Sequence, residues 1–237
     1  MFTYIKQFLP KSWHFRLVNL KHTFTKFRQV HYAQNCEDIM TLSLFPKSHK
    51  GFYVDVGAHH PYRISNTYLL HKQGWRGINI DANPETIAMF KRARPQDINL
   101  QLAISDEKQT LTYYKFSDPA VNTFSQEHAE KFMDKKWISY LGETTIETQT
   151  LEETLSKHIP KNQPIDVLTI DVEGLDLAVL QSNDWNTHRP QVVIVEALDF
   201  KLEQMQEHAL YQFMHKHDYD LVYVAKFSLI FTNKRPA

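Results

Sequence analysis

Short apolar runs recur along the chain at residues 52–56, 77–80, 98–104, 166–170 and 191–195. Four of the five are followed directly by a glycine or an acidic residue. The runs are rich in Val and Ile and lack the polar alternation of a half-exposed strand, which is typical of strands buried on both faces of a parallel sheet. We therefore expect five core strands with polar groups at their carboxyl ends.

Helical patterns separate these runs, at residues 65–72, 84–92, 175–181 and 202–213. Asn83 and Pro84 suit the N-cap and the first turn of the second helix. Two further strands, at 221–225 and 227–231, predict a C-terminal β-hairpin. This alternation of strands and helices predicts an α/β fold with a doubly wound, mostly parallel sheet.

The stretch from about residue 105 to 150 interrupts the alternation. It holds two strand-like segments, 111–116 and 144–150, separated by a polar stretch. We interpret it as an insertion that overhangs a site as a lid. With no internal repeat and no low-complexity tract, residues 31–237 are expected to form one domain, preceded by a distinct segment over residues 1–30.

Charge sets that first segment apart. The chain has 27 Lys and Arg against 27 Asp and Glu, yet residues 1–36 contain six basic residues and no acid. Apolar positions with helical spacing predict a basic amphipathic helix; they are Trp13, Leu17, Leu20, Phe24 and Phe27.

Such a helix packs on its own domain, forms a dimer through residues 12–29 or lies on an anionic membrane. A basic stripe alone predicts no specific nucleic-acid partner. No apolar run is long enough to span a bilayer and no secretory signal is apparent, so we expect a cytoplasmic protein, with contact to the inner membrane surface left open.

Glycine is scarce, with six in 237 residues, and a single cysteine, Cys36, excludes an internal disulfide framework. The first strand ends in Asp55-Val-Gly57-Ala-His59, which lacks the further glycines of a dinucleotide-binding loop. This argues against a pyrophosphate and favours a nucleoside ligand. Asp81, after the second strand, is placed to accept hydrogen bonds from ribose hydroxyls. Structural roles for Asp55 and Asp81 remain the alternative.

Several motifs together resemble one family. They are YAQNCED at 32–38, GFYVDVGAHHP at 51–61, SNTY at 65–68, GWRGINIDANP at 74–84, AISD at 103–106, TLEETL at 150–155 and IDVLTIDVEG at 165–174. In order and spacing this set is similar to the FkbM family of S-adenosylmethionine-dependent methyltransferases, over roughly residues 31–232. The resemblance implies a class I, Rossmann-like methyltransferase fold and O-methylation of a hydroxyl on a saccharide or another polar small molecule.

The resemblance also implies which residues hold S-adenosylmethionine. Asp55, Gly57 and Ala58 would hold its methionine end and Asp81 its ribose, although many members have Glu at that last position. The remaining candidates would flank the adenine or close over the cofactor; they are Ser105, Asp106, Gln34 and Asp38.

Methylation of an alcohol gains from a base that removes the hydroxyl proton. Our candidates, in order, are Asp171, Glu173, Glu196 and His59, with a helix-capping role for Glu173 and a structural role for Glu196 as alternatives. Candidate acceptor contacts are His60, Tyr62, Arg63, Asn66, Asn122 and Trp137. No residues have diagnostic metal spacing, so no metal is expected. The alternative functions are a nicotinamide-dependent oxidoreductase and a catalytically silent, methyltransferase-like binding module.

Overall fold

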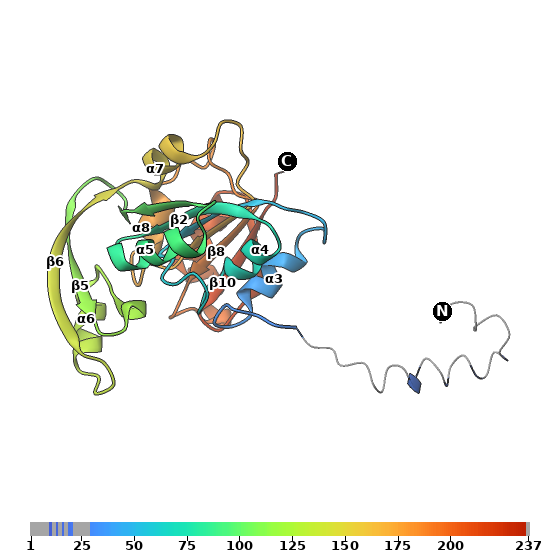
Figure 1. The fold of residues 1–237 in the computed structure, drawn as a ribbon, viewed down its shortest axis with the longest axis horizontal. Coiled ribbons are helices and arrows are strands. Elements are labelled where there is room, and N and C mark those ends of the chain that lie inside the picture. The colour runs from blue at the N-terminus through green and yellow to red at the C-terminus, as the bar shows by residue number, and fades with distance from the viewer. Residues whose placement is uncertain (1–9, 11–12, 14–15, 17–18, 21–28, 236–237) are drawn as a thin grey trace. The chain divides into compact units, whose positions relative to one another are not determined.

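A seven-stranded sheet forms the centre of the unit His31–Ala237 (Figure 1). In the computed structural model, which describes residues 10, 13, 16, 19–20 and 29–235, the strand order is β3-β2-β1-β7-β8-β10-β9. The strands are β1 (Phe52–Val56), β2 (Arg76–Asp81), β3 (Ile98–Gln101), β7 (Val167–Ile170), β8 (Val192–Glu196), β9 (Tyr219–Val224) and β10 (Ser228–Asn233). All pair in parallel except β10, which is antiparallel to β8 and β9. The doubly wound sheet and the C-terminal hairpin are confirmed.

The register brings the carboxyl ends of the central strands level with one another. Val56 at the end of β1 lies beside Ile80 on β2 and Ile170 on β7. The strand order reverses between β1 and β7, and such a switch point is where ligands bind in open α/β sheets. The polar residues that follow these strands therefore meet at one edge of the sheet.

Helices cover both faces of the sheet because alternate strand residues point to opposite sides. On one face, α7 (Leu151–His158), α8 (Asp176–Gln181) and α9 (Ala209–Lys216) pack on a core that includes Phe52, Val54 and Val56. On the other, α3 (Glu37–Ser43) and α4 (Tyr68–Lys72) pack around Tyr53 and Trp75. The remaining helix, α5 (Pro84–Ala93), contacts β2 and β3.

One local feature predicted from the sequence is confirmed, and two predicted elements are each divided in the structure. The Asn83 side chain caps α5 as predicted, accepting a hydrogen bond from the Glu85 N–H at 3.0 Å. The run 98–104 is not one strand, because it divides into β3 and the two-residue β4 (Ala103–Ile104), which belongs to a different sheet. The pattern at 202–213 likewise divides into a 3-10 helix, η3 (Leu202–Glu207), and α9.

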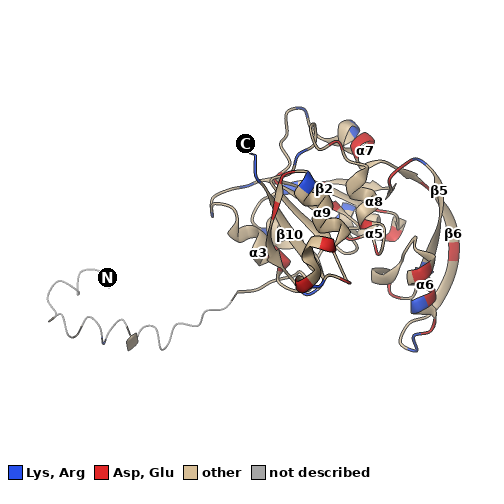
Figure 2. Ribbon diagram, turned by 180° about the vertical axis from the view of Figure 1, so that it is seen from behind, with Lys and Arg blue, Asp and Glu red and all other residues tan. Residues whose placement is uncertain are grey.

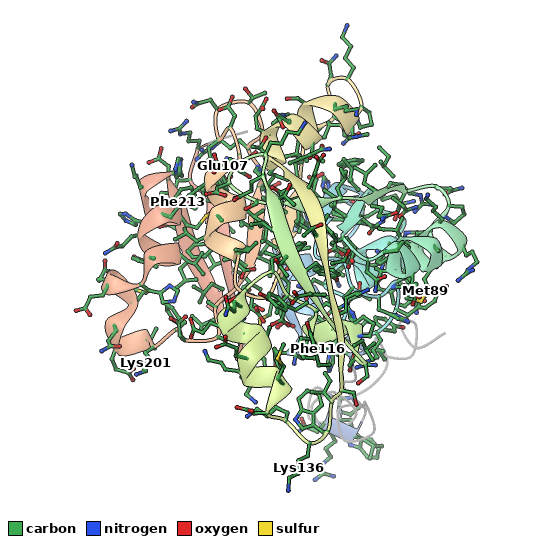
Figure 3. All side chains as sticks on the ribbon, turned by 90° about the vertical axis from the view of Figure 1, so that its left-hand side faces the viewer. Met89, Glu107, Phe116, Lys136, Lys201 and Phe213 are labelled. Carbon is green, nitrogen blue, oxygen red and sulfur yellow. The ribbon has the colours of Figure 1, made fainter. Side chains whose placement is uncertain are left out.

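The insertion forms a structure of its own. A long antiparallel pair, β5 (Thr110–Phe116) and β6 (Tyr140–Gln149), joins β4 in a three-stranded sheet, and η2 (Pro119–Val121) and α6 (Gln126–Met133) lie between the two long strands in sequence. A small apolar cluster of Phe116, Ala129 and Ile138 holds α6 to them. The pair runs in front of the main sheet, with Lys136 at its far end (Figure 3).

The basic helix predicted for residues 1–30 falls mostly outside the described residues. Its proposed contacts with a membrane or a partner subunit therefore remain predictions. Within the described part of the chain, no helix combines the length and the hydropathy needed to cross a bilayer.

Candidate active site

A cavity of about 480 Å³ opens at the carboxyl ends of β1, β2, β7 and β8 and is bounded on its other side by the insertion. Its volume lies in the range typical of small-molecule sites. Many of the sequence-predicted residues line it, namely Gln34, Asp55, Gly57, Ala58, His59, Asn66, Asp81, Asn122, Trp137, Asp171, Glu173 and Glu196. The insertion contributes η2, Phe124, Phe132 and Trp137 to the wall, as expected of a lid.

The turn after β1 depends on Gly57. This residue has φ +79°, a conformation that strongly favours glycine, and a Cβ there would lie 1.7 Å from the backbone oxygen of Asp171. The N–H groups of Gly57 and Ala58 both donate to the Ile80 carbonyl, at 2.9 and 3.0 Å. Gly57 therefore permits the ends of β1, β2 and β7 to converge at the floor of the cavity.

Asp55 is a buried carboxylate that faces this cavity. Its Oδ2 accepts a hydrogen bond from the Thr67 hydroxyl at 2.5 Å, whereas Oδ1 accepts none from the described residues. Burial raises the pKa of Asp55 to about 6, against the opposing effects of Thr67 and of the Arg94 charge. One carboxylate oxygen is therefore left for a cationic ligand group, which fits the ammonium of S-adenosylmethionine.

Asp81 ends β2 and is held by backbone donors. Its Oδ2 accepts from the His59 N–H at 2.9 Å and its Oδ1 from the Asn83 N–H at 2.7 Å. Burial raises its pKa to about 6. Because each carboxylate oxygen has two lone pairs, both keep capacity for a ligand hydroxyl, which fits a ribose diol.

The wall beyond Asp81 is apolar. It consists of Leu102, Ala103, Ile104, Tyr113, Val121 and Phe124. Leu102 is held at this edge by donating its N–H to the Asp81 carbonyl at 3.1 Å. Such a surface suits a flat heterocycle. The AISD motif predicted only its polar residues as adenine contacts, whereas the apolar residues that precede them form the wall.

Three carboxylates gather at the other end of the cavity. Asp171, Glu173 and Glu196 each offer an oxygen within 4.8 Å of the other two, and among the described residues these carboxylates accept no hydrogen bond. Burial is the largest cause of their raised pKa values, and repulsion from nearby carboxylates adds to it: Asp176 helps to raise the pKa of Glu173 to about 7, and the pKa values of Asp171 and Glu196 lie well above the ordinary range. The group is thus suited to accept a proton or bind a cation, including a divalent metal ion.

Glu173 does not cap α8, contrary to the structural alternative for this residue. The N-cap position is Leu175, which forms no side-chain cap, and Asp176, the first residue of α8, accepts from the N–H groups of Val172 and Gly174 in the preceding turn, at 3.1 and 3.2 Å. Glu173 itself has φ +52°, which is uncommon outside glycine. The backbone therefore presents its carboxylate to the cavity at some conformational cost.

His59 is the remaining base candidate and also has positive φ, +52°. Both of its ring nitrogens are buried and have no hydrogen-bond partner among the described residues. Burial lowers its pKa, so the imidazole is neutral at physiological pH and one nitrogen is free to accept a proton.

Three of the expected cofactor contacts, Asp38, Ser105 and Asp106, lie outside the cavity wall and are engaged within the protein. Asp38 is fully buried and accepts from the N–H groups of Tyr32 and Ile39, at 2.7 and 2.9 Å. Ser105 is also buried and donates its hydroxyl to Asp106 at 3.0 Å, and neither residue reaches the cavity wall.

Three expected acceptor contacts also lie outside the cavity. His60 Nδ1 accepts from the N–H groups of Tyr62 and Arg63, at 3.1 and 3.0 Å, and so stabilises the turn that all three share. Arg63 instead forms an exposed ion pair with Asp118 of the insertion, at 3.4 Å. These residues connect the loop after β1 to the lid without lining the cavity.

A second cavity, of about 900 Å³, adjoins the first and shares Phe132, Glu173, Glu196 and Leu198 with it. It lies among α6, the turn before α8 and the segment from η3 to the start of α9. Helix α6 carries both acidic and basic residues (Figure 2), and Lys131 pairs with Glu127 at 2.7 Å. Glu173 and Glu196 of the acidic cluster thus stand where the two cavities meet, whereas Asp171 lines only the first.

Three solved structures align with most of this chain at low identity. A precorrin-6y C5,15-methyltransferase from Geobacter metallireducens GS-15 has 13% identity and a TM-score of 0.39, with 84% of this chain and 87% of that chain covered. A TehB-like SAM-dependent methyltransferase from Corynebacterium glutamicum has 11% identity and a TM-score of 0.40, with 94% and 97% covered. An O-methyltransferase from Bacillus cereus, in complex with SAH, has 12% identity and a TM-score of 0.40, with 97% of this chain and 94% of that chain covered. Similarity at this level carries no argument about function.

No curated protein matches the chain. The sequence does match the methyltransferase FkbM domain over residues 55–221, which is most of its length. That span runs from Asp55 through the Asp81 turn to the acidic cluster and on into β9. The residues that build the cavity are therefore largely those of the matched domain, and the chain belongs to the FkbM family of S-adenosylmethionine-dependent methyltransferases.

Proposed function

We propose that this methyltransferase modifies a hydroxyl group of a saccharide or another polar small molecule and that Asp171 is its catalytic base. The observation that supports the proposal most is the position of the acidic cluster. Its carboxylates accept no hydrogen bond from the described residues; Glu173 and Glu196 line both cavities, and Asp171, with an oxygen within 4.8 Å of each of them, lines the first. A base must reach both the reacting oxygen and the methyl donor, and the junction of the two cavities is the place that allows it.

The proposed cofactor contacts follow from the donors and acceptors on the wall. S-adenosylmethionine, when bound, supplies a methyl group on a sulfonium. The free Oδ1 of Asp55 accepts from the ammonium of its methionine end, and Asp81 accepts from its ribose hydroxyls. The apolar wall at residues 102–104 covers the adenine. Held in this way, the methyl donor is oriented toward the acidic cluster.

The acceptor enters from the second cavity and passes Glu173 and Glu196. Trp137 stands at the rim of the cofactor cavity with 66% of its surface exposed. An exposed, rigid aromatic ring offers a flat apolar platform on which the C–H face of a sugar packs. The other two cavity-lining candidates are engaged within the protein, since Asn66 donates to Thr169 and Asn122 accepts from the Phe116 N–H.

Asp171 would take the proton of the acceptor hydroxyl while the methyl group passes from the sulfonium to that oxygen, so that the C–S bond breaks, a neutral thioether leaves and the carboxyl is protonated. Its raised pKa brings its proton affinity closer to that of the developing acid and so favours the transfer. Glu173 and Asp176 repel the charge on Asp171 and thereby maintain that affinity. Alignment of the acceptor oxygen with the methyl group supplies the other large contribution to the rate.

The experiment compares Asp171→Asn with the wild-type protein. Transfer of a radiolabelled methyl group to a panel of saccharides and small polyols should fall by about 100-fold or more, the usual contribution of a positioned base. Affinity for S-adenosylhomocysteine, measured by calorimetry, should stay within about threefold because the cofactor contacts remain.

Asp134→Asn, at an exposed position after α6, is the matched control and should behave as wild type. Unchanged turnover in Asp171→Asn would remove this residue from the mechanism. Cofactor binding by the wild-type protein with no transfer to any acceptor would instead favour the catalytically silent module.

A further inference from the structure

A buried arginine lies beneath the loop that follows β1. Arg94 is fully buried just after α5, and its guanidinium contacts three parts of that loop. Nη2 donates to the Pro61 carbonyl at 2.6 Å and to the Ser65 hydroxyl at 3.1 Å, and Nη1 donates to the Thr67 hydroxyl at 2.9 Å. One side chain therefore ties together both ends of the segment 61–67.

This loop forms part of the cofactor cavity and is strained. Ile64, Ser65 and Asn66 line the cavity, and Ile64 has φ +50°, a genuine outlier for a β-branched residue. Such a conformation persists only where the surrounding structure enforces it. The hydrogen bonds from Arg94 on either side of Ile64 provide that restraint.

The same arginine fixes the direction of a hydroxyl proton. A guanidinium only donates hydrogen bonds, so the Thr67 oxygen must accept from Arg94. The hydroxyl proton of Thr67 is then free to point to Asp55 Oδ2, which lies 2.5 Å away. Asp55 is thereby held with its other oxygen toward the cavity.

We propose that Arg94 and Thr67 are positioning residues for the methyl donor: through their hydrogen bonds they keep Asp55 ionised and oriented for the ammonium of the cofactor. This inference rests on the cofactor of the family and not on the identity of the acceptor. Neither residue lines the cavity, so each acts through another group.

Charged groups around Asp55 shift its pKa, and this makes the proposed role of Thr67 and Arg94 measurable. Arg94 favours its ionised form, whereas Asp97, on the same side of the sheet, disfavours it. Asp81 on β2 and Asp171 after β7 also interact with it electrostatically. Asp97 is itself occupied by hydrogen bonds from Tyr53 and Asn79 and by an ion pair with His71 at 3.3 Å. The Thr67 hydroxyl is thus the neutral donor on which the balance at Asp55 depends.

The test measures S-adenosylhomocysteine binding by calorimetry at about pH 6, the midpoint of the Asp55 titration, and at about pH 8, well above it. Thr67→Val should weaken binding by about tenfold at the lower pH and by less than about threefold at the higher. The reason is that Asp55 without its donor retains a proton to higher pH. Thr67→Ser keeps the hydroxyl and should restore wild-type binding at both values.

Thr41→Val is the matched control. Thr41 is equally buried and its hydroxyl has no hydrogen-bond partner among the described residues, so the substitution should leave binding unchanged. Arg94→Lys, where folded by circular dichroism, should show the same pH-dependent loss as Thr67→Val, because an ammonium cannot reproduce the forked contacts.

Equal losses at both pH values in Thr67→Val would mark a merely structural role and overturn the inference, as would unchanged binding. A wild-type protein that binds no S-adenosylhomocysteine at either pH would contradict the cofactor assignment itself. That outcome is distinct from a failure of the proposed acceptor chemistry, which this binding experiment does not involve.

Discussion

The two ends of the cavity treat their carboxylates in opposite ways. At one end, Asp55 and Asp81 accept hydrogen bonds from a hydroxyl and from backbone N–H groups, at 2.5 to 2.9 Å. At the other, Asp171, Glu173 and Glu196 lie close together and accept none from the described residues. Burial is the largest cause of the raised pKa at all five carboxylates. The second-largest influence differs, because hydrogen bonds lower the pKa values of Asp55 and Asp81, whereas repulsion by other carboxylates raises those of the second group further.

The difference suits one end of the cavity to ligand binding and the other to the chemical step. Carboxylates that accept fixed hydrogen bonds are oriented in advance and hold a ligand without rearranging. Carboxylates that repel one another have a high affinity for a proton or a cation, and this is what a base requires. The same residue type thus serves as a rigid ligand contact at one end and as a reactive group at the other.

The largest effect on binding is expected from a substitution of Gly57, which lies at the floor of the cavity between its two ends. In Gly57→Ala, the new Cβ meets the Asp171 carbonyl and the residue keeps an unfavourable φ. We expect S-adenosylhomocysteine binding to fall by more than about 100-fold, together with a loss of stability of several kcal/mol, the range for strained or overpacked sites. Gly142→Ala, at φ +115° in open space, isolates the conformational cost alone and should leave binding intact.

A smaller effect is expected at the cofactor end. Asp81→Asn weakens two backbone contacts and the proposed ribose contact, so binding should fall by about 10- to 100-fold, as for lost hydrogen bonds to a charged group. Asp106→Asn serves as its control, because Asp106 lies outside the cavity wall, and should stay within about twofold. Calorimetry that finds the two substitutions equally harmful would contradict the placement of the ribose.

The sequence predicted the fold and much of the cavity because those signals are local. A strand that ends in an acid or glycine places that residue at the sheet edge, and this rule located Asp55, Asp81, Asp171 and Glu196. Ser105 and Asp106 follow the same rule but miss the cavity, since the chain at 103–104 leaves the main sheet to pair with β6. The residues of a continuous apolar run do not show where one strand ends and the next begins.

The hydrogen-bond network beneath the cavity was not predictable in this way. Arg94 reaches Pro61 and Thr67 across 33 and 27 positions of the sequence, and nothing in its own neighbourhood marks it as buried. A lone arginine after a helix most often lies at the surface. Its role follows from the packing of α5 against the loop, which is a tertiary property.

The smallest expected effect concerns the acceptor side. Trp137→Ala removes the exposed ring at the cavity rim, and we expect the KM for the acceptor to rise by about three- to tenfold, the size of a single aromatic contact. Affinity for S-adenosylhomocysteine should not change. Tyr140→Ala is the control, because it removes a nearby, exposed aromatic ring that lies outside the cavity wall. Trp185→Phe would not serve, because that ring is buried in the core.

The contrast between the two ends is tested most directly by the pH dependence of the unfolding free energy. A carboxyl whose pKa is raised by folding binds its proton more tightly in the native state, so stability falls as pH rises from the ordinary pKa to the raised one. Asp55 and Asp81 titrate near pH 6 and Glu173 near pH 7, whereas the pKa of Glu196 is raised to about 11 and burial with nearby carboxylates raises that of Asp171.

The interval between about pH 7 and about pH 9 lies above the midpoints of Asp55 and Asp81, so urea unfolding across it reports mainly on the acidic cluster, where the charge of Asp171 helps to raise the pKa of Glu196. The wild-type protein should lose stability across this interval, and Asp81→Asn should lose it with the same slope. Asp171→Asn should show a flatter slope and be the more stable protein at the upper pH, by on the order of 1 kcal/mol or more. Parallel slopes in all three proteins would contradict the claim that the uncompensated charge resides in the cluster formed by Asp171, Glu173 and Glu196.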